Sequence, residues 1–67
     1  MRNRIAELRK AHRLTQQDLA DRVEVTRQTI ISLENGRYNP SITLAFKLSR
    51  TFGLTIEEIF VYEEDES

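Results

Sequence analysis

Residues 15–35, TQQDLADRVEVTRQTIISLEN, constrain the fold of this chain most, because they contain two short helical patterns in close succession. Each pattern opens with a threonine that can cap a helix and continues with apolar residues three or four positions apart. Since so few residues separate the patterns, the two helices must cross at a fixed angle. The stretch therefore predicts a rigid pair of helices joined by a tight turn.

The first pattern predicts a helix that begins directly after Thr15. The Thr15 hydroxyl can cap the free amides of the first turn, and Asp18 can complete a reciprocal capping box. Leu19 and Val23 then share one face of the helix. Ala20 is small enough for the backbone of a second helix to approach it closely.

The second pattern predicts a helix capped by Thr26, with Ile30 and Leu33 on its buried face. The residues on or near the opposite side are Arg27, Gln28, Ile31, Ser32 and Asn35. We expect Ile31 to pack against its neighbours, whereas the other four suit a solvated face. Such a polar outer face is typical of helix-turn-helix units, whose second helix reads bases in the major groove of DNA.

The chain resembles the phage-repressor-like (Cro/cI, or xenobiotic-response-element) helix-turn-helix family from Ile5 to about Phe60. The motifs that carry the resemblance are LRK at 8–10, LTQQDLA at 14–20, VEVT at 23–26, RQTIISLENGRYNPS at 27–41 and LAFKLSRTFGLTIEEIF at 44–60. The resemblance implies an all-α, compact five-helix lambda-repressor-like DNA-binding domain. Residues 1–67 would form this single domain, with the helix-turn-helix unit at 15–35 and an acidic C-terminal tail at 61–67.

Glu24 departs from the family pattern, which usually has glycine at this turn position. The chain there tends to adopt a left-handed conformation that a residue with a side chain enters at an energetic cost. We therefore expect either strain or a shifted turn at Glu24.

The resemblance and the chemistry of the side chains together predict which residues contact DNA. The predicted base-reading residues are Arg27, Gln28 and Ser32, since arginine can bond guanine and glutamine can bond adenine with two hydrogen bonds each. The predicted phosphate-binding residues are Gln16, Gln17, Thr29, Asn35, Arg37 and Tyr38. The alternative is that Arg27 and Gln28 are ordinary solvated residues, or that Arg27 meets only a phosphate.

Two further structural roles are predicted. The resemblance implies an ion pair between Arg9 and Glu34, of the kind that is costly to break on one side only. The apolar residues of the last helix and the start of the tail form the expected dimer interface, unless they only close the core of the monomer. These residues are Ile56, Ile59, Phe60, Val61 and Tyr62.

The remaining capping signals predict two more helices. Ser41 can cap a helix that runs to Gly53, and Thr55 with Glu58 forms another capping box. Beyond residue 60 two interpretations stay open. The chain end frays, or Val61 to Glu64 form a short terminal β-ribbon with Met1 to Arg4.

The charge of the chain is unevenly distributed. The net charge is −1, but residues 57–67 carry six acidic residues and no base, whereas residues 1–56 carry ten basic residues and five acidic ones. The body therefore has a net charge of +5, which suits the phosphate backbone of DNA, with the acidic end held away from it.

We therefore expect a sequence-specific, DNA-binding transcriptional regulator that acts as a repressor. A homodimer would bind a palindromic operator on double-stranded DNA, with helix 26–35 in the major groove. The alternative is a protein-interaction module of the same fold, such as an antitoxin or a bridging factor. With His12 as the single histidine and no cysteine, we expect no enzyme, metal site, cofactor or small-molecule ligand. No apolar run is long enough for a membrane span, so a cytoplasmic location is expected.

Overall fold

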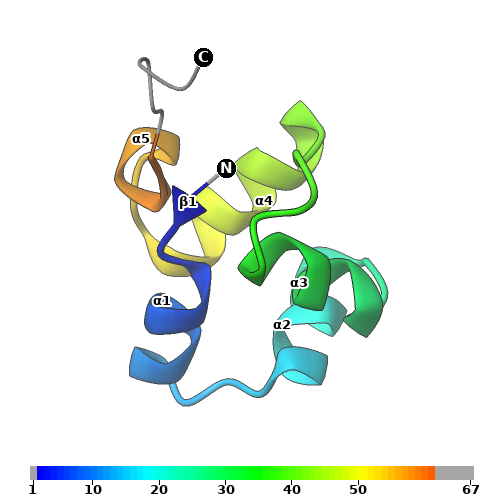
Figure 1. Cartoon of the computed structure of the whole chain (residues 1–67). Helices are drawn as coiled ribbons and strands as arrows, with labels where there is room; N and C mark the ends of the chain where they lie inside the picture. The colour runs from blue at the N-terminus through cyan, green and yellow to red at the C-terminus, as the bar shows by residue number, and fades with distance from the viewer. Residues whose placement is uncertain (1, 62–67) are drawn as a thin grey trace.

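The computed structural model describes residues 2–61, which form five helices and a two-stranded ribbon (Figure 1). The helices are α1 (Ile5–Ala11), α2 (Gln16–Val23), α3 (Arg27–Glu34), α4 (Ile42–Phe52) and α5 (Ile56–Ile59), and the strands are β1 (Arg2–Asn3) and β2 (Phe60–Val61). The predicted five-helix fold is confirmed. In Figure 1, β1 lies above α1 and beside α5, whereas the loop that joins α1 to α2 lies at the bottom of the view.

Four of the helices begin as the capping signals predict. The hydroxyls of Thr15, Thr26, Ser41 and Thr55 each accept a hydrogen bond from the backbone amide three residues later. The boxes of α2 and α5 are reciprocal, because the Asp18 and Glu58 carboxylates accept from the Thr15 and Thr55 amides at 2.9 and 2.8 Å. These local bonds satisfy amides that the helices leave unpaired.

The two capping boxes predict a loss of stability in acid. The backbone amide and then the hydroxyl of Thr15 lower the pKa of Asp18, and Thr55 lowers the pKa of Glu58 in the same way. Because these pKa values are depressed in the folded state, their stabilisation is complete above the unfolded-state pKa of about 4. It is lost as the pH falls through the folded-state values.

We therefore expect the melting temperature to be nearly constant from about pH 7 to 5 and to fall below about pH 4.5. Thermal unfolding followed by circular dichroism over this range measures the effect. An Asp18→Asn variant should be less stable near neutral pH and should show a shallower decrease in acid. Parallel pH profiles for variant and wild type would contradict this account.

Each of α1 to α4 is followed by a residue with left-handed backbone. These residues are Arg13, Glu24, Gly36 and Gly53, with φ values of 58°, 62°, 73° and 68°. In each case the next amide bonds back to a carbonyl five residues earlier, as from Val25 to Ala20 at 3.0 Å. Three of these following residues, Leu14, Val25 and Leu54, are apolar and pack against the core. The left-handed turn thus ends the helix and returns the chain to the interior.

Of the two expectations for Glu24, strain or a shifted turn, the structure shows the first: Glu24 adopts the left-handed conformation. Its carboxylate also accepts a hydrogen bond from Lys47 Nζ at 2.7 Å. This ion pair is exposed and contributes little. We expect Glu24→Gly to raise the melting temperature by roughly 2–6 °C, because glycine enters this conformation freely.

The matched reference is Glu24→Ala, which loses the same ion pair but keeps the cost of the left-handed turn. The converse variant is Gly53→Ala, since a β-carbon there meets no atom within 4 Å and only the backbone conformation opposes it. Its melting temperature should fall. A Glu24→Gly protein that melts at or below the temperature of Glu24→Ala would refute the explanation.

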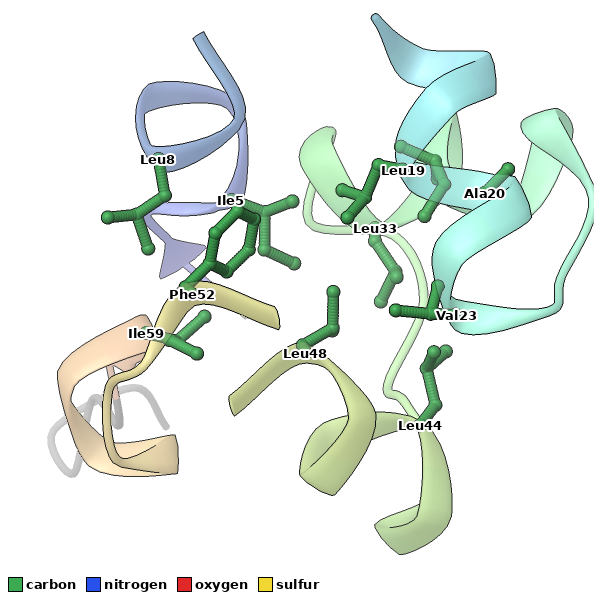
Figure 2. Close-up of a cluster of buried hydrophobic side chains, with 11 residues drawn as sticks. Ile5, Leu8, Leu19, Ala20, Val23, Leu33, Leu44, Leu48, Phe52 and Ile59 are labelled. Atoms are coloured by element: carbon green, nitrogen blue, oxygen red, sulfur yellow. The ribbon is translucent and has the colours of Figure 1, made fainter. Parts of the chain in front are cut away.

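The core is formed where all five helices meet. Figure 2 shows side chains from α1, α2, α3, α4 and α5 turned toward one interior, with Leu48 of α4 near its centre. Its buried members are Ile5, Leu8, Leu19, Ala20, Val23, Ile30, Leu33, Leu44, Leu48, Phe52 and Ile59. Ala20 is fully buried, as its small size predicts. Burial of this apolar surface is the main force that holds the short helices together.

Of the two interpretations left open for the chain end, the structure shows the terminal ribbon, but its second strand begins one residue earlier, at Phe60. Arg2 pairs with Val61 and Asn3 with Phe60 in antiparallel register, and the Arg4 amide continues the ladder to the Ile59 carbonyl at 2.8 Å. The predicted strand began at Val61. Its remaining residues, 62–64, lie outside the part of the chain that the structure describes.

Candidate nucleic-acid interface

The α2–α3 pair is held rigidly by its buried faces. Leu19, Ala20 and Val23 of α2 and Ile30 and Leu33 of α3 are at most 1% exposed. Because these positions fill the inner face of both helices, α3 can rotate or slide only by opening the core. The outer face of α3 is therefore presented in one fixed orientation.

The first turn of α3 carries two of the predicted base-reading residues on its surface. Arg27 and Gln28 are exposed, whereas Ser32, one turn later, is half-buried. Ile31 is also half-buried, as its apolar side chain predicts. No acidic residue lies in the first turn of α3, so the positive end of this helix and Arg27 act together on an approaching anion.

Three of the predicted phosphate-binding residues have protein partners. Gln16 Nε2 donates to Glu34 Oε1 at 3.1 Å, and Gln17 Nε2 donates to Asp21 Oδ1 at 2.9 Å. The Thr29 hydroxyl lies 3.0 Å from that of Thr26. A phosphate contact by either glutamine would therefore use its second amide proton or break the bond described here.

The other three predicted phosphate-binding residues lie around the end of α3. Asn35, Arg37 and Tyr38 are all exposed, with Tyr38 at 43%. The Arg37 amide is bonded to the Ser32 carbonyl at 3.0 Å, so the backbone that carries these side chains is fixed to the last turn of α3. The candidate surface therefore extends from Arg27 at one end of α3 to Tyr38 beyond the other.

Arg9 and Glu34 form an ion pair that joins α1 to α3. Arg9 Nε lies 2.7 Å from Glu34 Oε2, and the two side chains are 11% and 9% exposed. Arg9 also donates to the Leu14 carbonyl at 2.9 Å. Together with the Gln16 bond, this network links the start of α2 and the α1–α2 loop to the last residue of α3.

The predicted dimer residues lie in different environments. Ile59 is fully buried in the core of the chain, which agrees with the alternative that this residue closes the core of the monomer. Phe60 packs partly against the same core, Ile56 is half-buried and Val61 is 39% exposed. Tyr62 lies outside the described residues.

Sequence reasoning missed a second exposed apolar surface, on α4. Ile42 and Phe46 are 72% and 55% exposed, and Phe46 lines a shallow pocket with Thr43, Lys47 and Arg50. The four-residue spacing of Ile42 and Phe46 could have indicated this face, because it places both on one side of the helix. Within residues 2–61 no helix is long and apolar enough to cross a membrane, and no group of potential metal ligands comes together.

Comparison with known proteins identifies the class to which this fold and surface belong. A family model described as helix-turn-helix matches residues 5–59. The chain belongs to this family, the helix-turn-helix transcriptional regulators of the Cro/cI (xenobiotic-response-element) type.

Individual relatives agree with this assignment. The chain is 53% identical over 66 residues to an uncharacterised HTH-type transcriptional regulator of Methanocaldococcus jannaschii, covering 98% of this chain and 100% of that protein. It is 32% identical to an immunity repressor protein of Bacillus phage phi105, covering 91% of this chain and 46% of the repressor. A crystal structure of a transcriptional regulator from Listeria innocua matches with a TM-score of 0.78 at 22% identity, covering 100% of this chain and 68% of that one, and shows the same fold.

Proposed function

We propose that this regulator is a repressor that binds a palindromic operator as a homodimer, with α3 in the major groove. The observation that carries the proposal is the exposure of Arg27 and Gln28 on the first turn of a helix whose opposite face is fully buried. Two-fold pairing is part of the proposal because a single small module covers only about 600–1,000 Å² of DNA-facing surface. The relation to a phage immunity repressor supports repression.

The proposal is tested by selecting binders from randomised duplex DNA with the purified protein and with Gln28→Ala. We expect a palindromic consensus with half-sites about 34–36 Å apart. Gln28→Ala should relax the preference at one defined position of each half-site, because a good bidentate contact discriminates by about 1–3 kcal/mol. Gln17→Ala is the matched control, since a phosphate contact carries no sequence preference.

The salt dependence of binding provides a second measurement. The logarithm of the affinity should fall linearly with the logarithm of salt concentration, with a slope of about −0.9 per phosphate contact. Absence of both an enriched sequence and a salt slope would refute the proposal.

A protein-interaction module is the second candidate function, and the exposed Ile42 and Phe46 on α4 favour it. The two functions make different predictions for Phe46→Asp. This change should leave operator binding intact in a repressor that dimerises through its terminal surface, whereas it should abolish binding of a partner protein on α4.

A further inference from the structure

Asn3 joins three parts of the fold, two through its side chain and one through its backbone. It lies in β1, where its backbone pairs with Phe60 of β2. Its Nδ2 donates to the Leu33 carbonyl of α3 at 2.7 Å, and its Oδ1 accepts from the Ile5 amide at the start of α1 at 3.0 Å. The N-cap residue of α1, Arg4, makes no capping bond with its own side chain, so Asn3 supplies that cap.

The bond to Leu33 acts on the end of α3 from which the candidate phosphate contacts extend. Leu33 belongs to the last turn of α3, and its carbonyl also accepts from the Gly36 amide at 3.0 Å. Asn35 and Arg37 lie directly beside this point. Because the Asn3 bond is short and partly buried, water competes with it weakly. Asn3 therefore fixes the position of this turn relative to the terminal ribbon.

We infer that Asn3 is a positioning residue for DNA binding: it holds the C-terminal turn of α3 where Asn35 and Arg37 meet the phosphates. The inference rests on the proposed function, because it explains how the fold orients the surface assigned there. It also connects that surface to β2, which carries the exposed Val61 of the proposed dimer interface. A change that disrupts the pairing of β1 with β2 should therefore also alter the position of the last turn of α3.

The variant Asn3→Asp separates the two roles of the side chain. An aspartate keeps the oxygen that accepts from Ile5, and its negative charge suits the start of α1. It has no proton to donate to Leu33 and places a carboxylate against that carbonyl. We expect the melting temperature to fall by several degrees, because a partly buried carbonyl loses its donor. The affinity for DNA should fall by on the order of tenfold, the effect of about one hydrogen bond.

The salt slope distinguishes positioning from a general loss of folded protein. If phosphate contacts at the end of α3 are lost, the slope should become shallower by about one unit for each contact. A smaller folded fraction would lower the affinity without changing the slope. A pH series gives a further readout, because the carboxyl introduced by Asn3→Asp regains a donor for Leu33 when it is protonated. The ratio of wild-type to variant affinity should then approach one as the pH falls.

A measurement without DNA keeps this test separate from that of the proposed function. Hydrogen exchange of the Gly36 and Arg37 amides should be faster in Asn3→Asp than in wild type, whereas exchange in α1 should be unchanged. If Asn3→Asp folds poorly, Asn3→Ser replaces it, since a serine hydroxyl can cap Ile5 but is too short to reach Leu33. The inference would be overturned if these variants had the same DNA affinity, the same salt slope and the same exchange rates at Gly36 and Arg37 as the wild type. Faster exchange in Asn3→Asp, together with a wild-type protein that binds no DNA, would instead refute the proposed function and leave only the structural role of Asn3.

Discussion

Replacing Arg9 with alanine is expected to lower the free energy of unfolding by about 3–5 kcal/mol. The guanidinium and the Glu34 carboxylate are almost completely shielded from water, with side-chain exposures of 11% and 9%. Removal of Arg9 leaves the Glu34 charge with only the Gln16 amide as a described partner. It also removes the bond to the Leu14 carbonyl. Since a domain of this size has a total stability of only several kcal/mol, much of the variant should be unfolded at 25 °C.

Urea denaturation of the variant and the wild type measures the difference. Glu7→Ala is the matched control, because it breaks the exposed Arg4–Glu7 ion pair and should cost only about 0–1 kcal/mol. The double variant Arg9→Met, Glu34→Leu should recover most of the loss, because neither charge then remains buried. If Arg9→Ala costs no more than Glu7→Ala, the ion pair has no structural role.

Val61→Asp is expected to weaken binding to a full palindromic operator by roughly 10²–10⁴-fold, because two linked copies gain this much over one. This result is expected if the protein binds its operator as a homodimer through the terminal surface, as proposed above. Val61 is 39% exposed in β2, whereas Ile56 and Phe60 are half-buried and Ile59 is fully buried, so Val61 is the described residue of the terminal surface with the largest exposed fraction. A carboxylate in an apolar interface is costly unless it is paired. Sedimentation without DNA should show a shift from dimer to monomer.

Two controls locate the interface. Affinity for an isolated half-site should be the same for Val61→Asp and wild type, because the exposed Val61 side chain can change while the backbone pairing of β1 with β2, and with it the Asn3 contact to α3, stays in place. Phe46→Asp should remain dimeric if the terminal surface alone mediates association. Dissociation by Phe46→Asp but not by Val61→Asp would place the dimer on the α4 face and refute the proposed surface.

The helices could be predicted from the sequence because their signals are local. Thr15 with Asp18 and Thr55 with Glu58 form their capping boxes within four residues, and the apolar spacing of α2 and α3 identifies their buried faces. The Arg9–Glu34 pair joins residues 25 positions apart and could be predicted only through the family resemblance. Helical or strand periodicity relates only residues close together in the sequence, so it cannot indicate a contact between Arg9 and Glu34.

Most of the features that could not be predicted depend on contacts between residues far apart in the sequence. Asn3 reaches Leu33 across 30 residues, and Lys47 reaches Glu24 across 23. Whether Ile59 closes the core or stays on the surface depends on how α5 packs against the other helices, which apolar character alone does not determine. The left-handed turn at Arg13 was missed for a different reason, because arginine gives no compositional signal for that conformation.

The left-handed turns at Arg13 and Glu24 lie on either side of α2, and neither position holds glycine, although glycines occupy the equivalent positions after α3 and α4. Glycine at either position would therefore be expected to stabilise the domain, and both positions flank α2 rather than the reading helix α3. Substitutions at two such separate sites should combine almost additively. A substitution in α3 that changes DNA specificity but lowers stability could therefore be compensated by glycine at these two positions, in evolution or by design.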